Sequence, residues 1–525
     1  MKEKLERLRQ SRCLPYLSIL LSFLIVWIGE TGSYVWGGLC ILISLPLLAV
    51  PEYLLPSLFA AMLVDNNCYI WPGLTASRYL TVLFLLAQGI FVLFHERPRQ
   101  WGRKFFYPAV LVLYLLFSAI WVGHNFDLTV FTVAMNIVLA ALMGTLPAER
   151  RTSVWNLLFW SAAAVVSYLL FCLNFREVVI IGGRYWFLGE TNVNGIGMTL
   201  AQVAILFFIV MVRHPADRKG KWRSLGSFLG YVLSLYLLVL TGSRSALLGL
   251  VGGCAILSIL LLLRSEKGRI RRRQTANLVV TCCLSGVLCL TAPQIQQRVE
   301  LWKFDRTNPA PPVEEVVPGQ PETPETPETP DAPEEPSPEQ PETPEAPEEP
   351  IPPSREETEE QLQENTDSFW RRMNPFNAHW GKSAGRAEIW SILMEYAIKP
   401  HPLTGVGYGN VPDVLHAHGD DHSGAHNLVF AILSDLGLIG LLLLAVPLFR
   451  LLWRLLRRKD PAALLPLGLL ITTLVNGIGE NIYTERFLWF AVGLALWLLN
   501  SADPKEFGGK LENHESPVCD PVSVQ

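Results

Sequence analysis

Fourteen apolar segments run through this chain of 525 residues and restrict the folds open to it. Each approaches the length of roughly 20 residues that a helix needs to cross a bilayer, and the segment at 53–64 is the shortest. Half of the residues are hydrophobic and 17% are charged, with a mean hydropathy of +0.30, which is too apolar for a single soluble domain. The segments lie at 14–28, 34–50, 53–64, 79–94, 107–122, 128–146, 154–173, 195–212, 226–240, 246–263, 276–290, 428–449, 461–475 and 487–499.

Lysine and arginine gather in alternate connections between these segments. The basic connections are 97–104, 150–151, 213–223, 264–273 and 450–459, and the others carry few basic residues. Because cytoplasmic loops of membrane proteins hold the excess of basic residues, fourteen spans place these connections and both termini in the cytoplasm. We therefore predict an all-α polytopic protein of the cell membrane with about 12–14 transmembrane helices.

One long connection before the last three spans interrupts the pattern. Its middle, at 309–353, is so rich in Pro, Glu and Thr that it cannot bury a core and is typical of a disordered spacer. Helical spacing of apolar residues returns at 386–398, within a motif region at 369–425. The predicted organisation is N-terminal transmembrane helices at 1–290, an extracytoplasmic loop at 291–425, C-terminal transmembrane helices at 426–500 and a cytoplasmic tail at 501–525.

Polar residues gather where the predicted spans meet the outer face of the membrane. Arg244 lies in the turn Gly-Ser-Arg-Ser-Ala between two spans, and Arg386 opens the helix of the loop. His426 and Asn427 begin the apolar run that follows the loop. Since polar groups at a membrane boundary are costly to desolvate, we interpret them as functional.

Three further polar residues belong to the same predicted face. Arg184 and Asn194 precede the span at 195–212, and Glu480 lies in the last outer turn. With Asn427, they are candidates for contacts to a glycan or for support of the site. Arg184 is equally compatible with an ordinary loop residue, and Asn194 with a helix cap.

These residue types favour one kind of chemistry. Guanidinium groups bind phosphate oxygens in pairs of hydrogen bonds, so arginines at headgroup level can hold a pyrophosphate. Histidine is suited to take a proton from a hydroxyl near neutral pH. The combination indicates glycosyl transfer from a lipid-linked donor, in which the arginines stabilise the charge that develops on the leaving pyrophosphate.

The motifs together resemble the O-antigen ligase superfamily, which includes glycan polymerases and ligases. The resemblance rests on the turn around Arg244, on Gly-Arg-x-x-x-Trp at 385–390, on Gly-Val-Gly-Tyr-Gly at 405–409, and on His426-Asn427 with Gly-x-x-Gly at 437–440. It implies that Arg244 and Arg386 bind the undecaprenyl-pyrophosphate-linked glycan donor and that His426 activates the acceptor hydroxyl. The acceptor is then a glycan, a lipid or a protein. The Pro-rich spacer departs from the compact loop expected in this family.

A metal site is an alternative for the end of the loop. Its candidate ligands are His416, His418, His422, Asp413, Asp420 and Asp421, at spacings of two and four residues. The stretch has no matching second cluster, and the family resemblance implies a metal-independent enzyme. We interpret it as a hydrophilic loop that faces the glycan and expect no metal or other cofactor.

Simpler readings remain for the key residues and for the whole chain. Arg244 can extend toward lipid headgroups, Arg386 can be a solvated helix residue, and His426 can cap a helix. A transporter or flippase for lipid-linked glycans needs ionisable residues in mid-membrane, whereas these spans are almost free of charge. A third reading is a membrane protein that displays the Pro-rich loop. None of these readings involves nucleic acid.

Overall fold

A computed structural model describes most of the chain outside the termini and the spacer. The described residues are 11–28, 34–64, 69–71, 74–95, 98–122, 129–176, 178–181, 184–187, 193–213, 218–264, 269–307, 355–373 and 386–500. The predicted spacer at 309–353, the tail at 501–525 and Gly385 of the Gly-Arg motif lie outside them.

Every one of the fourteen apolar segments contains a helix, as expected for chains that must satisfy their backbone hydrogen bonds internally within a membrane. The helices before the loop are α2 (Leu14–Ile28), α3 (Tyr34–Leu47), α4 (Leu55–Leu63), α5 (Ala76–His95), α6 (Pro98–Phe117), α7 (Thr129–Met143), α8 (Arg151–Phe175), α9 (Val193–Arg213), α10 (Arg218–Leu240), α11 (Arg244–Arg264) and α12 (Arg269–Thr307). Those after the loop are α16 (Leu428–Arg457), α17 (Leu464–Asn476) and α18 (Arg486–Asn500).

Six of these helices are long and apolar enough to cross a membrane. The six spans are Ala76–Phe94, Ala148–Phe175, Val193–Val212, Trp222–Leu240, Arg244–Leu263 and Leu428–Arg457. The chain is thus a multi-pass, mostly helical membrane protein, as predicted, while the number of 12–14 crossings stays a prediction. Helix α4, with nine residues, rises only about 14 Å and is buried throughout, so it is too short to cross the bilayer alone.

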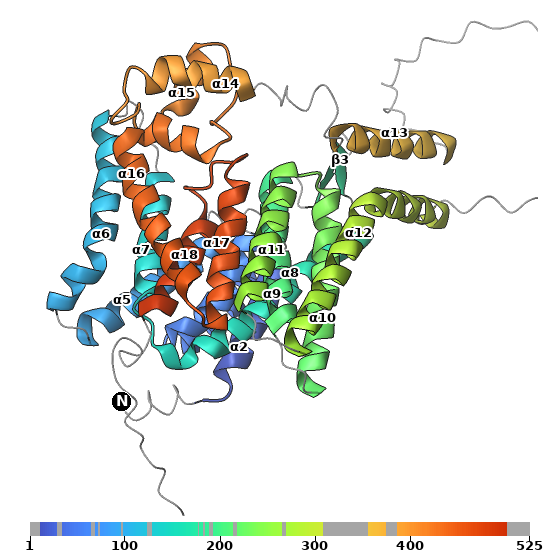
Figure 1. Ribbon diagram of the computed structural model, residues 1–525, viewed down its shortest axis with the longest axis horizontal. Helices are drawn as coiled ribbons and strands as arrows, with labels where there is room; N and C mark the ends of the chain where they lie inside the picture. The colour runs from blue at the N-terminus through green and yellow to red at the C-terminus, as the bar shows by residue number, and fades with distance from the viewer. Residues whose placement is uncertain are drawn as a thin grey trace, which may run out of the picture.

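The helices form one bundle with α9 near its centre (Figure 1). Within the span of α9, 89% of the residues are buried, against 28% for α11, which leaves α11 largely open to lipid. Helix α11 packs closely on α17 through glycines. A Cβ added at Gly253 would lie 2.3 Å from Thr472 Oγ1, and one at Gly249 would lie 2.8 Å from Thr472 O. Small residues of this kind let membrane helices approach each other.

The long loop covers one end of the bundle with helices α14 (Arg386–Leu393) and α15 (Val411–Ala417) (Figure 1). A π-helical turn, Met394–Ile398, continues α14, so the helix predicted at 386–398 is present. The loop is tied to the bundle because Tyr408 N donates a hydrogen bond of 3.0 Å to Ser118 Oγ, and the Thr129 and Tyr408 hydroxyls lie 3.0 Å apart.

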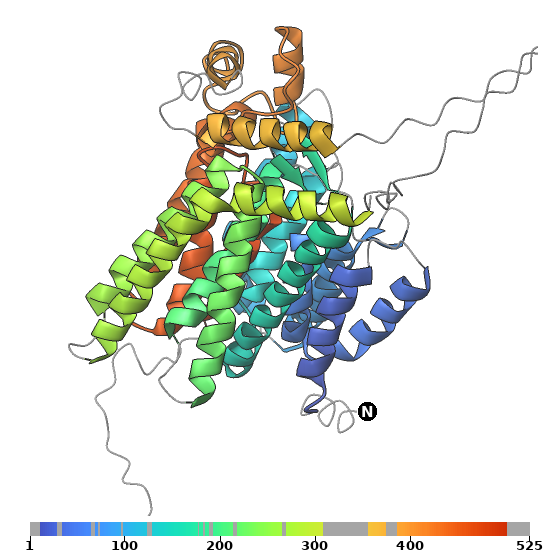
Figure 2. The same ribbon diagram turned by 90° about the vertical axis from the view of Figure 1, so that its right-hand side faces the viewer.

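Two features of the loop differ from the sequence-based expectations. Helix α12 continues to Thr307, across the expected boundary at residue 290, and α13 (Arg355–Met373) begins before the expected motif region at 369–425. The end of α12 and α13 lie side by side (Figure 2), joined by a hydrogen bond of 3.4 Å from Thr366 Oγ1 to Gln297 Oε1. The extra length of α12 is polar, which hid it from a search for apolar runs.

Two small antiparallel hairpins add to the helical fold. One pairs β1 (Tyr69–Trp71) with β2 (Leu74–Thr75), and the other pairs β3 (Val179–Ile181) with β4 (Arg184–Trp186). Short 3-10 turns at Pro51–Leu54, Ala148–Arg150 and Pro461–Ala463 precede helices. A π-helical turn at Ser118–Val122 extends α6.

Helix α16 is broken at Gly437, the first glycine of the Gly-x-x-Gly motif. Gly437 has φ 63°, and a Cβ there would lie 2.3 Å from Leu403 O, so only glycine fits the position. The loop supplies hydrogen bonds around the break, from Val406 N to Ser434 O (2.8 Å) and from Leu438 N to Pro402 O (2.9 Å). The break therefore attaches the loop to the helix that begins with the His-Asn pair.

Candidate active site

Asn427 anchors the start of α16. Its side-chain oxygen accepts hydrogen bonds from the backbone N–H groups of Val429 (2.9 Å) and Phe430 (3.2 Å), which makes it the N-cap of the helix. Its amide Nδ2 donates to Ile478 O at 3.0 Å. Asn427 thus joins the helix start to the turn after α17 and takes the capping role that was an alternative for His426.

His426 is held in an uncommon backbone conformation. Its φ of 48° lies in the left-handed region, and it is the single non-glycine residue with such a φ among the described residues. The neighbouring backbone is fixed because Trp390 Nε1 donates a hydrogen bond of 2.8 Å to Ala425 O. Outliers of this kind cluster at active sites, where the surrounding structure holds them in place.

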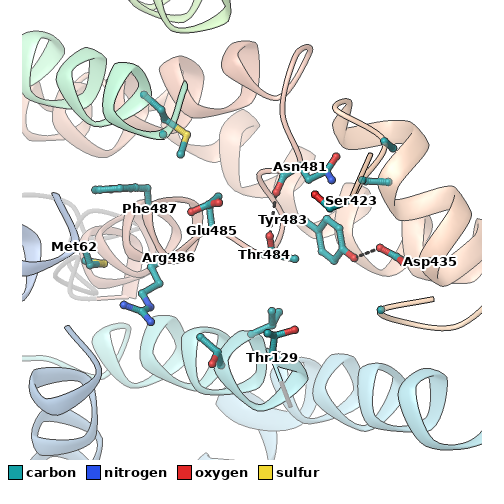
Figure 3. Close-up of a pocket in the computed structure, with 18 of the residues that line it drawn as sticks. Met62, Thr129, Ser423, Asp435, Asn481, Tyr483, Thr484, Glu485, Arg486 and Phe487 are labelled. Carbon is teal, nitrogen blue, oxygen red and sulfur yellow. Dashed lines mark hydrogen bonds between the residues drawn. The ribbon is translucent and has the colours of Figure 1, made fainter. Parts of the chain in front are cut away.

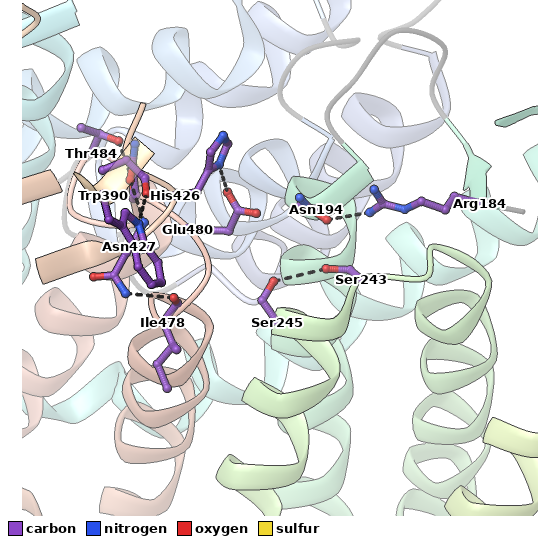
Figure 4. A network of polar contacts seen from close by, with 12 residues as sticks. Arg184, Asn194, Ser243, Ser245, Trp390, His426, Asn427, Ile478, Glu480 and Thr484 are labelled. Carbon is purple, nitrogen blue, oxygen red and sulfur yellow. Dashed lines mark hydrogen bonds and ion pairs between the residues drawn. The ribbon is translucent and has the colours of Figure 1, made fainter. Parts of the chain in front are cut away.

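Glu480 faces the His426 ring (Figure 4). The distance between His426 Nδ1 and Glu480 Oε2 is 3.6 Å, which is an ion-pair distance rather than a hydrogen bond. The His426 side chain is 29% exposed and that of Glu480 is 13% exposed, so the pair is open to a ligand on the histidine side. Glu480 Oε1 is buried and has no hydrogen-bond partner within the described residues.

Arg386 and Arg244 meet beside this pair. A Cβ added at Gly479 would lie 2.9 Å from Ser245 Cβ and 3.4 Å from Arg386 Nη1, so the start of α11, the start of α14 and this turn share one space. Arg244 directly precedes Ser245 at the start of α11, which places its backbone on the same side of the turn as Arg386. Two guanidinium groups brought together next to Glu480 form a place that a multiply charged anion would stabilise.

Arg184 supports the turn that carries Arg244. Its Nε donates to Thr241 O at 2.8 Å and its Nη2 donates to Asn194 Oδ1 at 2.6 Å (Figure 4). Its side chain also packs on Gly242, where an added Cβ would lie 3.2 Å from Arg184 Cγ. Of the two roles predicted for Arg184 and Asn194, this geometry favours support over direct contact with a glycan.

The arrangement brings residues that are far apart in sequence to one place in the structure. Residues 229–445 match the family model of the O-antigen ligases. The chain carries an O-antigen ligase domain. The match includes Arg244, Arg386, His426 and Asn427. No curated protein matches the chain.

An O-antigen ligase domain implies an enzyme that acts on lipid-linked glycans. Three of the predicted site residues, Arg184, Asn194 and Glu480, lie outside the matched range of the ligase domain. Arg184 nevertheless contacts that domain at Thr241 and Glu480 contacts it at His426, while Asn194 is bonded to Arg184. The candidate site therefore extends beyond the segment that the family model covers.

Sequence reasoning missed several residues that shape the ligase site. Trp390 holds Ala425 and stacks on Phe430, with ring centroids 5.1 Å apart. Asn481 Oδ1 accepts from Asn427 N at 3.3 Å, and Gly479 leaves room for Arg386. Trp390 belongs to the Gly-Arg-x-x-x-Trp motif, which could have indicated it. Asn481 and Gly479 have no such signal, because their role arises from the packing of α16 against α17.

The histidines near the end of the loop do not gather around one point. The His418 ring stacks on Tyr396 at 3.7 Å, and His422 Nδ1 lies 2.6 Å from Asp420 Oδ1. The described part of the ligase contains no group of three His, Cys, Asp or Glu side chains that could hold a metal ion. Desolvation acts to raise the pKa of Asp420, but hydrogen bonds from His422 and the nearby charges of His422 and His416 lower it overall.

Proposed function

We propose that this protein is a glycosyltransferase that moves a glycan from undecaprenyl pyrophosphate to an acceptor hydroxyl at the outer face of the cell membrane. The observation that carries the proposal is the convergence of His426, Glu480 and Arg386 on the turn at Gly479. A base, a carboxylate partner and clustered guanidinium groups are the groups that this transfer requires.

The chemical step follows from these positions. Arg244 and Arg386 bind the pyrophosphate oxygens, and His426 takes the proton of the acceptor hydroxyl. The acceptor oxygen then forms a bond to the anomeric carbon, and the bond from that carbon to the phosphate oxygen breaks. The electron pair of the broken bond leaves with undecaprenyl pyrophosphate, whose added charge the arginines stabilise. Glu480 stabilises the imidazolium form of His426, as a carboxylate does in other histidine-base sites. The arginines supply the positive charge, so we propose that the step needs no metal.

We place the site on the outer side of the membrane and both termini in the cytoplasm. Helix α16 begins at the site with Leu428 and ends with Arg454 and Arg457 in its last turn, which opens the basic connection at 450–459. Because basic connections are cytoplasmic, the opposite end of α16 faces outward. The acceptor is a glycan for a polymerase and a lipid, wall polymer or protein for a ligase, since one donor site serves both reactions.

Replacement of the proposed base tests this function in cells. We expect His426→Gln to change the size distribution of surface and lipid-linked glycans, while the matched variant His401→Gln, at an exposed histidine of the same loop, leaves it unchanged. Single lipid-linked repeat units would identify a polymerase, and long unattached chains a ligase. A wild-type profile with normal amounts of His426→Gln protein in the membrane would refute the proposal.

A further inference from the structure

A second cationic site lies next to the proposed active site. A cavity of about 500 Å³ opens between the membrane helices and the loop (Figure 3). Its wall includes Gly424 and Ala425, which lead directly into His426. Over the described residues, its lining does not include Arg244, Arg386 or Glu480. His426 is likewise absent from the described lining, so the cavity approaches the proposed base only through Gly424 and Ala425, away from the pyrophosphate arginines.

Two arginines bring positive charge to this cavity. Arg78, near the start of α5, is exposed and lines the wall. Arg486, the first residue of α18, also lines it and donates a hydrogen bond to the hydroxyl of Ser77. This bond holds Arg486 beside the residue that precedes Arg78. Both guanidinium groups therefore line one edge of the cavity, where hydrogen bonds from a guanidinium group to an anion are stronger than in bulk water.

The wall of the cavity also carries two carboxylates. Asp435 accepts a hydrogen bond from the Tyr483 hydroxyl at another part of the cavity (Figure 3), and Glu485 precedes Arg486. Helices α5, α7, α9 and α18 all begin at the cavity, and each N-terminus adds a partial positive charge of about +0.5. The helix ends reinforce the two arginines and offset the two carboxylates.

The remaining wall suits a sugar. Hydroxyl and amide groups that can pair with sugar hydroxyls come from Thr129, Thr132, Thr199, Ser423, Asn481 and Thr484. Apolar side chains such as Met62 and Phe487 supply surface for contact with the apolar face of a sugar ring. Pockets that bind small ligands have this mixture of apolar surface and a few polar groups, and they have similar volumes.

We propose that this cavity binds an anionic sugar residue of the acceptor, such as a uronic acid or a phosphorylated sugar, and thereby presents the acceptor hydroxyl to His426. The inference rests on the proposed transferase function and adds the charge class of the acceptor. Arg78 provides the main recognition of the anionic group, because Arg486 is also bonded to Ser77. Neutral acceptors lack this charge-assisted contact and bind more weakly.

Binding to the inactive protein tests the inference without requiring transfer. The probes are trigalacturonic acid, glucose 6-phosphate and neutral maltotriose, titrated calorimetrically into purified His426→Gln protein in a neutral detergent. We expect at least one anionic probe to bind about tenfold more tightly than maltotriose. This ratio corresponds to the contribution of about one charge-assisted hydrogen bond. A preference for trigalacturonic acid indicates a uronic acid, and a preference for glucose 6-phosphate a phosphorylated sugar.

Variants assign this preference to the cavity. Arg78→Gln, added to the His426→Gln protein, should abolish the preference for the anionic probe, and Arg78→Lys should retain part of this preference. Arg298→Gln, at an exposed arginine of α12, should retain all of it. Equal binding of all three probes, or an unchanged preference in Arg78→Gln, would overturn the inference. Transfer by the wild type is measured separately. If the wild type transfers glycan but shows no preference for an anionic probe, only the cavity proposal is removed. If an anionic probe is preferred but the wild type transfers no glycan, the proposed function is removed.

Discussion

At the scale of single residues, the site depends on how His426 is held. A left-handed conformation at a non-glycine residue costs on the order of 1–3 kcal/mol, and the contacts of Asn427 and Trp390 on either side maintain it here. Sequence alone indicated His426 and the arginines as candidates. It could not indicate the partner of His426, because Glu480 comes from another element and approaches only when α16 and α17 pack together.

Glu480→Gln tests the role of the carboxylate beside the base. The amide is similar in size but has no charge to stabilise the imidazolium, so we expect kcat to fall by about 10- to 100-fold. This is less than the roughly 100- to 10,000-fold that a general base itself contributes, because His426 remains in place. The KM for the donor should change by less than about twofold, because Glu480 is not proposed to contact pyrophosphate and its loss should not weaken donor binding in the ground state. Steady-state transfer kinetics check this, with Glu395→Gln at an exposed glutamate of the loop as the matched control. Unchanged kcat would remove Glu480 from the mechanism.

Arg386→Lys tests whether pyrophosphate is bound by a guanidinium fork. Lysine keeps the charge but loses the paired hydrogen bonds, so we expect donor affinity to fall by about tenfold. Binding of undecaprenyl pyrophosphate to the purified protein measures this, and Arg298→Lys serves as the control. Wild-type affinity in Arg386→Lys would show that the fork is not used.

At the scale of elements, the break in α16 joins the loop to the membrane helices. The apolar pattern predicted one continuous helix from residue 428, and helical periodicity carries no signal for the backbone bonds that Val406 and Leu438 make around Gly437. The polar extension of α12 was missed for a related reason: hydropathy measures composition, whereas the length of a helix depends on its neighbours.

Gly437→Ala tests this junction. Alanine is strained at φ 63° and its Cβ would meet Leu403, so we expect a loss of stability of about 1–3 kcal/mol or more. The loop should also become more accessible to limited proteolysis. Gly286→Ala is the matched control, because nothing lies within 4 Å of its added Cβ and alanine favours a helix. Thermal unfolding in detergent measures the stability of both variants, and equal stability would contradict the assigned role of Gly437.

At the scale of the whole molecule, the membrane helices bring four separate parts of the chain to one end of the bundle. Those parts are the β3–β4 hairpin, the start of α11, the loop helix α14 and the turn between α17 and α18. Composition and motif order sufficed to predict a multi-pass membrane protein with an O-antigen ligase domain. The cavity with Arg78 and Arg486 was not predicted, since these arginines belong to no motif and meet only in the folded bundle.

The most direct test of the central claim is transfer by purified protein from a radiolabelled undecaprenyl-pyrophosphate-linked glycan. Wild type, His426→Gln and His401→Gln are compared for donor binding and for release of undecaprenyl pyrophosphate in the presence of acceptor. If His426 is the base, His426→Gln binds the donor as wild type does but loses about 100-fold or more in transfer, while His401→Gln remains fully active. Normal transfer by a folded His426→Gln protein would contradict the account.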